Sequence, residues 1–299
     1  MKNEGIYLTL MAQVDKLARH NRQGSYRTKQ RYYEAMQRFC KFLAEEFRLQ
    51  KLVNMSGKHL VAYIQHLQES GRAASTIKTD LAAIRFFHDL MDAKHPLPDN
   101  SVFQLERRHF GDKDCTWSAA EISRFLDQCH ADGEHNFADV AELSVEMGLR
   151  IHEGFRLDTA AAEQVLRTGF LTVKGKGGKI RSIPATPRAC EILMDARSVT
   201  KRGHKLFVPD HVQTDAVILR MQTYIAAARP LVQDVGSERR MIHHGLRHTY
   251  AVRKYLEYIE AGFTPDAAAL RVSKLLGHER KEVTRVYLAS IKGTYPDYL

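Results

Sequence analysis

Three histidines and one arginine fall within six consecutive residues, His243-His244-Gly245-Leu246-Arg247-His248. His244 and Arg247 are three residues apart, so a helix would present both side chains to the same point. The segment has no carboxylate or thiol close by, and Arg247 would repel a cation, so a metal site is disfavoured. An H-x-x-R pair becomes informative when other reactive residues accompany it.

Such residues stand elsewhere in the chain. Arg150 and Glu153 have the i, i+3 spacing of a helix face, and His278 precedes Tyr287 by nine residues. A lone tyrosine in an apolar helix is usually part of the core, and a lone arginine usually lies on the surface. The order Arg, Lys, H-x-x-R, Gly-His, Tyr is much harder to obtain by chance, so we expect these residues to act together.

The lysine of this series, Lys176, lies in a glycine-rich turn, Gly175-Lys176-Gly177-Gly178, between two short β-leaning runs. This pattern predicts a β-hairpin over residues 169–184 with Lys176 at its tip. A nucleotide-binding P-loop is disfavoured, because that motif needs G-x-x-x-x-G-K-[ST] leading into a helix. The ordinary interpretation is a solvated basic hairpin, and the functional one is a lysine inserted into a DNA groove beside a phosphate.

The composition is that of a globular protein with a polyanionic partner. The 299 residues suffice for two domains, the mean hydropathy is −0.39, and the net charge is +10. No apolar run reaches the roughly 20 residues needed to cross a membrane, and no secretion signal opens the chain, so we expect a cytoplasmic protein. The four scattered cysteines suggest neither a disulfide framework nor a zinc site. Nucleic acid is the leading partner, and an anionic membrane surface is its main rival.

The pattern of apolar residues predicts helices over 27–48, 58–70 and 76–93, with Ser56 and Ser75 as N-caps. Residues 1–114 hold nineteen Lys and Arg against thirteen Asp and Glu, a surplus of six, which is more than half of the net charge. Residues 95–114, with two prolines and little periodicity, are typical of an inter-domain linker.

After this linker, Ser118-Ala119-Ala120-Glu121 has capping-box spacing and opens a new helix. Further helices are predicted after it, and Thr264-Pro265 is a helix start with Gly277 as the C′ residue of that helix. Their ranges are 137–158, 188–198, 212–229, 243–260, 265–276 and 281–290. The sequence therefore predicts a mainly α protein with a small β-sheet, with a helical domain over residues 1–110 and an α+β domain over residues 111–299.

Taken together, these residues resemble the tyrosine recombinase, or phage integrase, family. The resemblance covers residues 118–290, and the helical residues before them resemble the family's core-binding domain in size and charge. The positions that match the family's catalytic residues are Arg150, Lys176, His244, Arg247, His278 and Tyr287. Glu153 matches the acidic residue three places after the first arginine, and Tyr287 matches the nucleophile.

The resemblance implies cleavage and rejoining of duplex DNA through a 3′-phosphotyrosyl bond, without metal, ATP or other cofactor. The guanidinium forks of Arg150 and Arg247 suit phosphate oxygens, and His278 would add a donor. A phenol with a pKa near 10 is a poor nucleophile at neutral pH, so Tyr287 needs a base, a role that suits His244. Lys176 is then the candidate acid for the departing 5′-oxygen.

The same resemblance implies a tetramer on synapsed double-stranded DNA, allows accessory DNA-bending proteins, and suggests a mobile-element integrase. Gly154-Phe155-Arg156 replaces the family's usual aliphatic run, and only twelve residues follow Tyr287, which puts exchange of a C-terminal helix between subunits in doubt. Tyr295 and Tyr298 are poor rival nucleophiles, because Gly293 and Pro296 surround them. Two alternatives stay open: an inactive DNA-binding relative, and a type IB topoisomerase.

Overall fold

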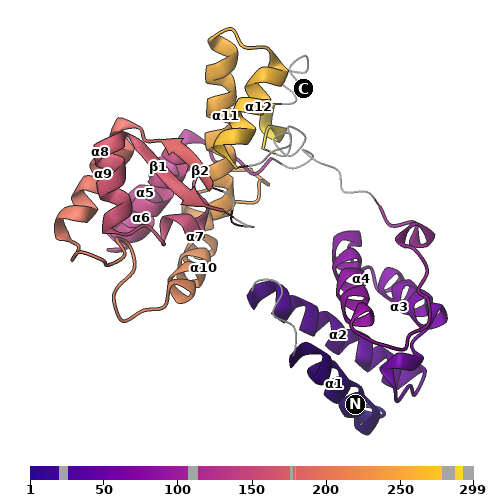
Figure 1. The fold of residues 1–299 in the computed structure, drawn as a ribbon. Coiled ribbons are helices and arrows are strands. Elements are labelled where there is room, and N and C mark those ends of the chain that lie inside the picture. Colours follow the sequence, from indigo (N-terminus) through magenta and orange to yellow (C-terminus); the bar gives the residue numbers. More distant parts are fainter. Residues whose placement is uncertain (20–25, 107–113, 176–177, 179, 278–286, 292–299) are drawn as a thin grey trace. The chain divides into compact units, whose positions relative to one another are not determined.

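The computed structural model describes residues 1–19, 26–106, 114–175, 178, 180–277 and 287–291. Lys176, His278, Tyr295 and Tyr298 therefore lie outside the described residues. The chain divides into two compact units, Met1–Arg108 and His109–Leu299. Both are built mainly from helices, and the second also holds a two-stranded sheet, so the predicted fold class is confirmed (Figure 1).

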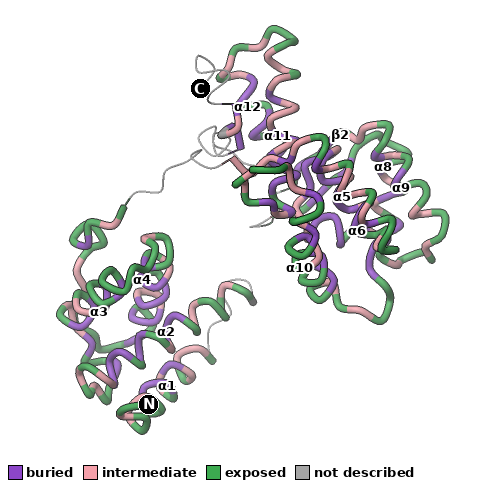
Figure 2. The backbone as a smooth tube through the Cα atoms, turned by 180° about the vertical axis from the view of Figure 1, so that it is seen from behind, coloured by how far each residue is buried: buried purple, intermediate pink, exposed green. Residues whose placement is uncertain are grey.

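In its described part, the first unit has four α-helices around one apolar core. They are α1 (Glu4–Arg19), α2 (Tyr26–Glu46), α3 (Gly57–Glu69) and α4 (Ala74–Asp89). Each helix turns one apolar stripe inward, as the buried stretches in Figure 2 show. A short 3₁₀ turn at Leu52–Asn54 joins α2 to α3, and another at Asn100–Phe103 packs Phe103 onto the same core. Part of the segment predicted as linker thus belongs to this unit.

Of the two predicted N-caps in this unit, one is confirmed and one is wrong. Ser56 precedes α3, and its backbone N–H donates to Nδ1 of His59 at 3.0 Å. Ser75, by contrast, lies inside α4, whose N-cap is Ala73. The helix starts earlier because the Ala73 carbonyl already accepts from the N–H groups of Thr76 and Ile77.

In its described part, the second unit packs seven longer helices and one very short one against a β-hairpin. In order they are α5 (Ala119–Ala131), α6 (His135–Met147), α7 (Ile151–Gly154), α8 (Thr159–Thr168), β1 (Phe170–Lys174), β2 (Ile180–Pro184), α9 (Pro187–Val199), α10 (Thr214–Val232), α11 (His243–Glu260) and α12 (Pro265–Leu275), followed by a 3₁₀ turn at Ala289–Ile291. Ser118 caps α5 and Thr264 caps α12 with their side chains, as predicted. The predicted helix over 281–290 lies largely outside the described residues.

One continuous helix was expected over residues 137–158, and this expectation is wrong. Gly148 has φ +64° and ends α6, and the chain resumes as the single turn α7 after Arg150. A Cβ atom at Gly148 would lie 2.4 Å from Cδ1 of Tyr250 on α11, so the backbone approaches α11 more closely than any side chain allows. The break leaves Arg150 in extended backbone at the start of α7.

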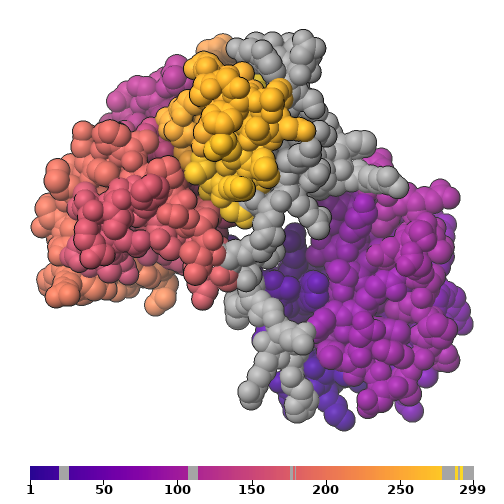
Figure 3. Space-filling model, turned by 45° about the horizontal axis from the view of Figure 1, so that its top comes forward, coloured from indigo at the N-terminus to yellow at the C-terminus, as the bar shows by residue number. Residues whose placement is uncertain are grey.

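The hairpin and the last helices complete the frame that holds the site. Strands β1 and β2 pair antiparallel, with Phe170 opposite Pro184 and Lys174 opposite Ile180. Helix α11 packs on α6 and α12, and α12 packs on β2. Figure 3 shows the surface of the α11–α12 region (yellow) against the earlier parts of the same unit (red to orange). Within the described residues, no helix is both long and apolar enough to cross a membrane.

Candidate active site

Four of the six predicted catalytic residues meet in the second unit. Arg150 lies at the start of α7, His244 and Arg247 on the first two turns of α11, and Tyr287 in the turn before Ala289–Ile291. The other two predicted catalytic residues, Lys176 and His278, lie outside the described residues. The site therefore joins segments that are far apart in the sequence.

The first turn of α11 is fixed by the segment just before α5. Nε1 of Trp117 donates to the Ile242 carbonyl at 3.0 Å, and the Trp117 backbone N–H donates to Oγ1 of Thr249 at 2.9 Å. At Gly245 a Cβ atom would lie 2.1 Å from the Cys115 carbonyl oxygen. Only glycine permits this close approach, which sets where His244 and Arg247 stand.

Tyr287 is buried against α11, with 5% of its surface exposed. Its Oη lies 3.5 Å from Nε2 of His244, at the outer limit of a hydrogen bond. Its ring packs on His248, with the two ring centres 4.4 Å apart. Leu288 and Ile291 bury their side chains in the core formed by α11 and α12 and so anchor this turn.

The histidines around Tyr287 are neutral at pH 7. Although His244 is an exposed residue, partial burial of its ring, followed by the charges of Arg247 and Arg150, lowers its pKa to about 4. Burial also lowers the pKa of His248 to about 4. A neutral His244 in the Nδ1-protonated tautomer offers Nε2 as an acceptor for the phenolic proton.

Arg247 is completely buried beneath Tyr287. Its Nη1 donates to the Gly148 carbonyl and its Nη2 to the Leu276 carbonyl, while its guanidinium carbon lies 5.9 Å from the centre of the Tyr287 ring. Burial lowers the pKa of Arg247 to about 10, so the group keeps its charge at neutral pH. Its Nε is buried without an acceptor among the described residues.

Arg150 is held by Glu153, and Glu153 is held by a second arginine. Nη1 of Arg150 donates to Oε1 of Glu153 at 2.9 Å, and Arg181 on β2 binds both carboxylate oxygens at 2.8 and 2.7 Å. Burial alone would raise the pKa of Glu153, but the hydrogen bonds and charge of Arg181, together with Arg150, hold it at about 2. Glu153 is thus an anion throughout the physiological range.

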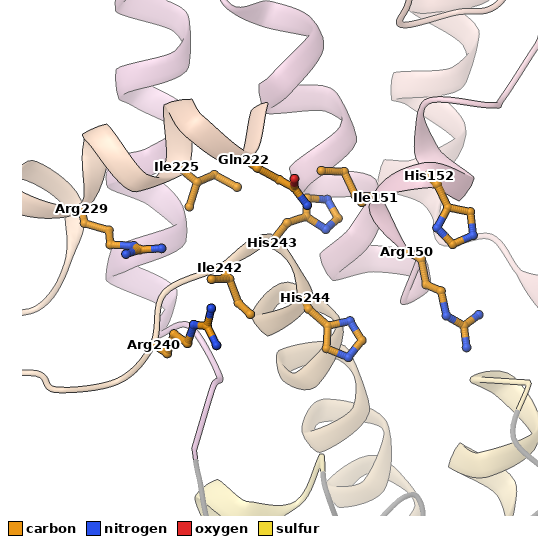
Figure 4. A pocket seen from close by; sticks show the side chains of 10 residues that line it. All are labelled: Arg150, Ile151, His152, Gln222, Ile225, Arg229, Arg240, Ile242, His243 and His244. Carbon is orange, nitrogen blue, oxygen red and sulfur yellow. The ribbon is translucent and has the colours of Figure 1, made fainter. Parts of the chain in front are cut away.

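A pocket of about 480 Å³ opens between α7, α10 and the start of α11 (Figure 4). Basic side chains dominate its lining, and none of its lining residues is acidic. The lining residues are Arg150, Ile151, His152, Gln222, Ile225, Arg229, Arg240, Ile242, His243 and His244. In Figure 4 Arg150 and His244 extend toward the same side of the pocket. Such a lining suits an anion, which the cationic donors could bind.

In the described part of the chain, no three His, Cys, Asp or Glu side chains are grouped so that they could hold a metal ion. The described site residues present arginine forks, neutral histidines and one phenol.

Two residues of this site were missed by the sequence reasoning. In the sequence, His248 stands out only as part of the histidine cluster, although its spacing from His244 puts both on one face of α11. Arg181 falls within the predicted hairpin, and no local motif gives it a role. The available signal was strand alternation, because Arg181 lies two residues before the buried Ile183 and so on the same face of β2.

Comparisons with known proteins agree with this geometry. Residues 117–293 match the family model described as the Phage integrase family, and residues 10–93 match the model described as Phage integrase, N-terminal SAM-like domain. The first match covers more than half of the chain, so the chain belongs to the phage integrase family, the tyrosine recombinases. The predicted enzyme class, a site-specific DNA recombinase, is confirmed.

Individual relatives extend the likeness over most of the length. Tyrosine recombinase XerC of Natranaerobius thermophilus is 27% identical over 277 residues, which are 88% of each chain. Tyrosine recombinase XerD of Halalkalibacterium halodurans is 26% identical over 274 residues, covering 88% of this chain and 87% of the relative.

Solved structures share the fold at lower identity. A post-cleavage complex of XerH recombinase with a palindromic difH substrate is 17% identical, with a TM-score of 0.64 over 93% of this chain and 80% of XerH. A lambda integrase tetramer bound to a Holliday junction is 16% identical, with a TM-score of 0.64 over 93% of this chain and 76% of the integrase.

Proposed function

We propose that Tyr287 attacks a phosphodiester of duplex DNA and becomes covalently joined to the 3′-phosphate. The observation that carries this proposal is the placement of Tyr287: its hydroxyl faces neutral His244, and its ring lies over the charged Arg247. A phenol beside a base and a buried cation suits nucleophilic attack on a phosphate.

In the cleavage step, a bond forms between Oη of Tyr287 and phosphorus, and the bond from phosphorus to the 5′-oxygen breaks. The phenolic proton passes to His244, and Lys176 gives a proton to the departing 5′-oxygen. Rejoining reverses the step: the 5′-hydroxyl of a partner strand attacks phosphorus and releases Tyr287. The phosphotyrosyl bond keeps the energy of the cut strand, so neither ATP nor a ligase is required.

Arg150 and Arg247 stabilise the charge that grows on the non-bridging oxygens. Arg150 reaches the open pocket, where basic groups surround the space for a phosphate. A buried N–H without an acceptor, such as Nε of Arg247, is unfavourable by about 1–3 kcal/mol, and a phosphate oxygen would supply that acceptor. His278, in the segment leading to Tyr287, would add a further donor.

The first unit binds DNA mainly through its phosphates, in keeping with its surplus of basic residues. Four copies assemble on two synapsed duplexes, as the lambda integrase neighbour does on a Holliday junction. Accessory DNA-bending proteins, a cytoplasmic location and a mobile-element role belong to the same proposal. The basic pocket, whose lining residue His244 contacts Tyr287, favours an active recombinase over an inactive DNA-binding relative.

Strand exchange tests the proposal against a type IB topoisomerase. The protein would first select its site from a random library of duplexes, and the selected duplex would then be supplied in two lengths, one of them labelled. We expect recombinant molecules with the label in new lengths, without ATP. Relaxation of supercoiled DNA without any exchanged product would favour the topoisomerase, and binding without any cut strand would favour the inactive relative.

A further inference from the structure

The carboxylate of Glu153 is shared between two arginines at the base of the site. Oε1 accepts from Nη1 of Arg150 at 2.9 Å and from Nη1 of Arg181 at 2.8 Å. Oε2 accepts from the Arg150 backbone N–H at 2.8 Å and from Nη2 of Arg181 at 2.7 Å. Each arginine therefore occupies both oxygens, and the carboxylate has no room for a further strong donor.

The two arginines differ in what else they can reach. Glu153 and Arg181 are 5% and 7% exposed, whereas the Arg150 side chain is 24% exposed and lines the basic pocket. Two guanidinium groups and one carboxylate leave the trio with one net positive charge, and the exposed member is Arg150. Without Arg181, only the charge of Arg150 would balance the carboxylate of Glu153. The remaining pair would then carry no net charge.

We propose that Arg181 is a positioning residue of the cleavage reaction, which neutralises Glu153 so that the charge of Arg150 stays available to the DNA phosphate. This inference rests on the proposed function. Arg181 does not line the pocket that Arg150 enters, so it acts through Glu153 and Arg150 rather than on the reacting atoms.

The position of Arg181 in the fold strengthens this role. It lies on β2, and its partner Glu153 lies on α7. Its aliphatic stem packs on Gly277, where a Cβ atom would lie 3.0 Å from Cδ of Arg181. The buried side chain of Arg181 thus connects β2 with Glu153 on α7 and with Gly277, the residue before His278.

A second Arg–Glu pair in the same unit provides a matched control. Arg188 on α9 binds Glu142 on α6 through two hydrogen bonds of 2.7 and 3.0 Å, much as Arg181 binds Glu153. Arg188 is half exposed, and neither residue lines the site pocket. Exposed pairs of this kind contribute little to stability, so breaking this one should change little.

The test is a double-mutant cycle on the full chain, with Arg181→Met, Glu153→Gln and the double variant. A nicked suicide duplex of the selected site, with protein in excess, yields the first-order rate constant of covalent complex formation, which does not depend on the folded fraction. Loss of one preorganised oxyanion-hole donor slows catalysis by about 10²–10³-fold. We expect Arg181→Met to be about 100-fold slower, with its Kd for intact duplex within about threefold of the unmodified protein.

The double variant restores one net positive charge, carried by Arg150. We expect it to cleave within about tenfold of the unmodified chain, because the neutral amide that replaces the Glu153 carboxylate no longer opposes Arg150. Arg181→Lys, which keeps the charge but not the fork, should lie between Arg181→Met and the unmodified chain. The cycle at Arg188 and Glu142 should leave every rate within about threefold of the unmodified chain.

Three results would overturn the inference. They are an Arg181→Met variant that cleaves at the unmodified rate, a double variant that is as slow as Arg181→Met, and a control cycle that reproduces the same losses. If Arg181→Met does not fold, the double variant alone tests the proposal, because it contains no buried unpaired charge. A hundredfold loss of cleavage rate in the double variant would then contradict the proposal. Absence of any covalent complex with the unmodified chain would instead refute the proposed function.

Discussion

Acidification from pH 7 to pH 5 should destabilise the second unit, because two buried histidines beside the site resist protonation. Burial lowers the pKa of His243 to about 3 and that of His248 to about 4, and both side chains are 4% exposed. In an unfolded chain a histidine titrates near pH 6.5. Below that pH the unfolded state binds more protons than the folded state, so stability is lost as the pH falls.

The expected size follows from these pKa values. At pH 5 each of the two histidines lowers the free energy of unfolding by about 2 kcal/mol. Burial raises the pKa of Asp139 to about 6, so this residue becomes neutral in the folded state and adds about 1 kcal/mol of stability at pH 5. His244 is exposed, so solvent screening makes its contribution to this loss small. Glu153, with its pKa of about 2, contributes almost the same stability to the folded state at pH 7 and at pH 5. That stability is lost only as the pH falls below about 4.5, the pKa of Glu153 in the unfolded chain. The net loss is about 3 kcal/mol.

Trp117 makes this loss measurable in the second unit alone. It is the only tryptophan of the chain, is 2% exposed, and donates to the Ile242 carbonyl beside His243. Urea unfolding followed by its fluorescence at the two pH values yields the two free energies by linear extrapolation. In His243→Gln the difference between pH 7 and pH 5 should shrink by about 2 kcal/mol. Equal stability at both pH values, or an unchanged difference in the variant, would refute the reasoning.

Three further predictions concern the cleavage reaction and the packing of the second unit. Lys176→Ala should slow cleavage of ordinary DNA far more than binding and should recover on a 5′-bridging phosphorothiolate, whose sulfur leaves without a proton; an equal defect on both substrates would exclude Lys176 as the acid. Gly148→Ala should destabilise the second unit by about 3 kcal/mol in the same urea assay, because the added Cβ would lie 2.4 Å from the Tyr250 ring at φ +64°; a loss below about 1 kcal/mol would contradict the packing. Cleavage should persist in EDTA, and a loss that magnesium restores would contradict catalysis by side chains alone.

Local rules predicted much of the fold from the sequence. Apolar residues at three-to-four spacing located the helices, Ser118 and Thr264 marked two helix starts, and the glycine-rich turn marked the hairpin. These signals depend on neighbours along the chain. The helix predicted over 137–158 failed because its break at Gly148 comes from close contact with Tyr250, about a hundred residues away.

The site could be predicted in its residue types but not in its connections. The order of Arg150, the H-x-x-R pair and Tyr287 predicts that these side chains act together, and the structure brings them into one site. The burial of Arg247 beneath Tyr287 depends on packing between α11 and α12, which no short motif encodes. The link from Arg181 to Glu153 joins a strand to a helical turn, so only the three-dimensional arrangement reveals it.

The central claim is that Tyr287 carries the DNA, and mapping the covalent adduct tests it most directly. On a nicked suicide duplex of the selected site, the fragment needed for rejoining is lost, so protein bearing DNA should accumulate on a denaturing gel. Digestion and mass spectrometry should place the nucleotide on Tyr287. Tyr287→Phe keeps the buried ring and should abolish the adduct while duplex binding persists, whereas Tyr295→Phe and Tyr298→Phe should leave it unchanged. An adduct on any other residue, or an undiminished adduct in Tyr287→Phe, would contradict the account.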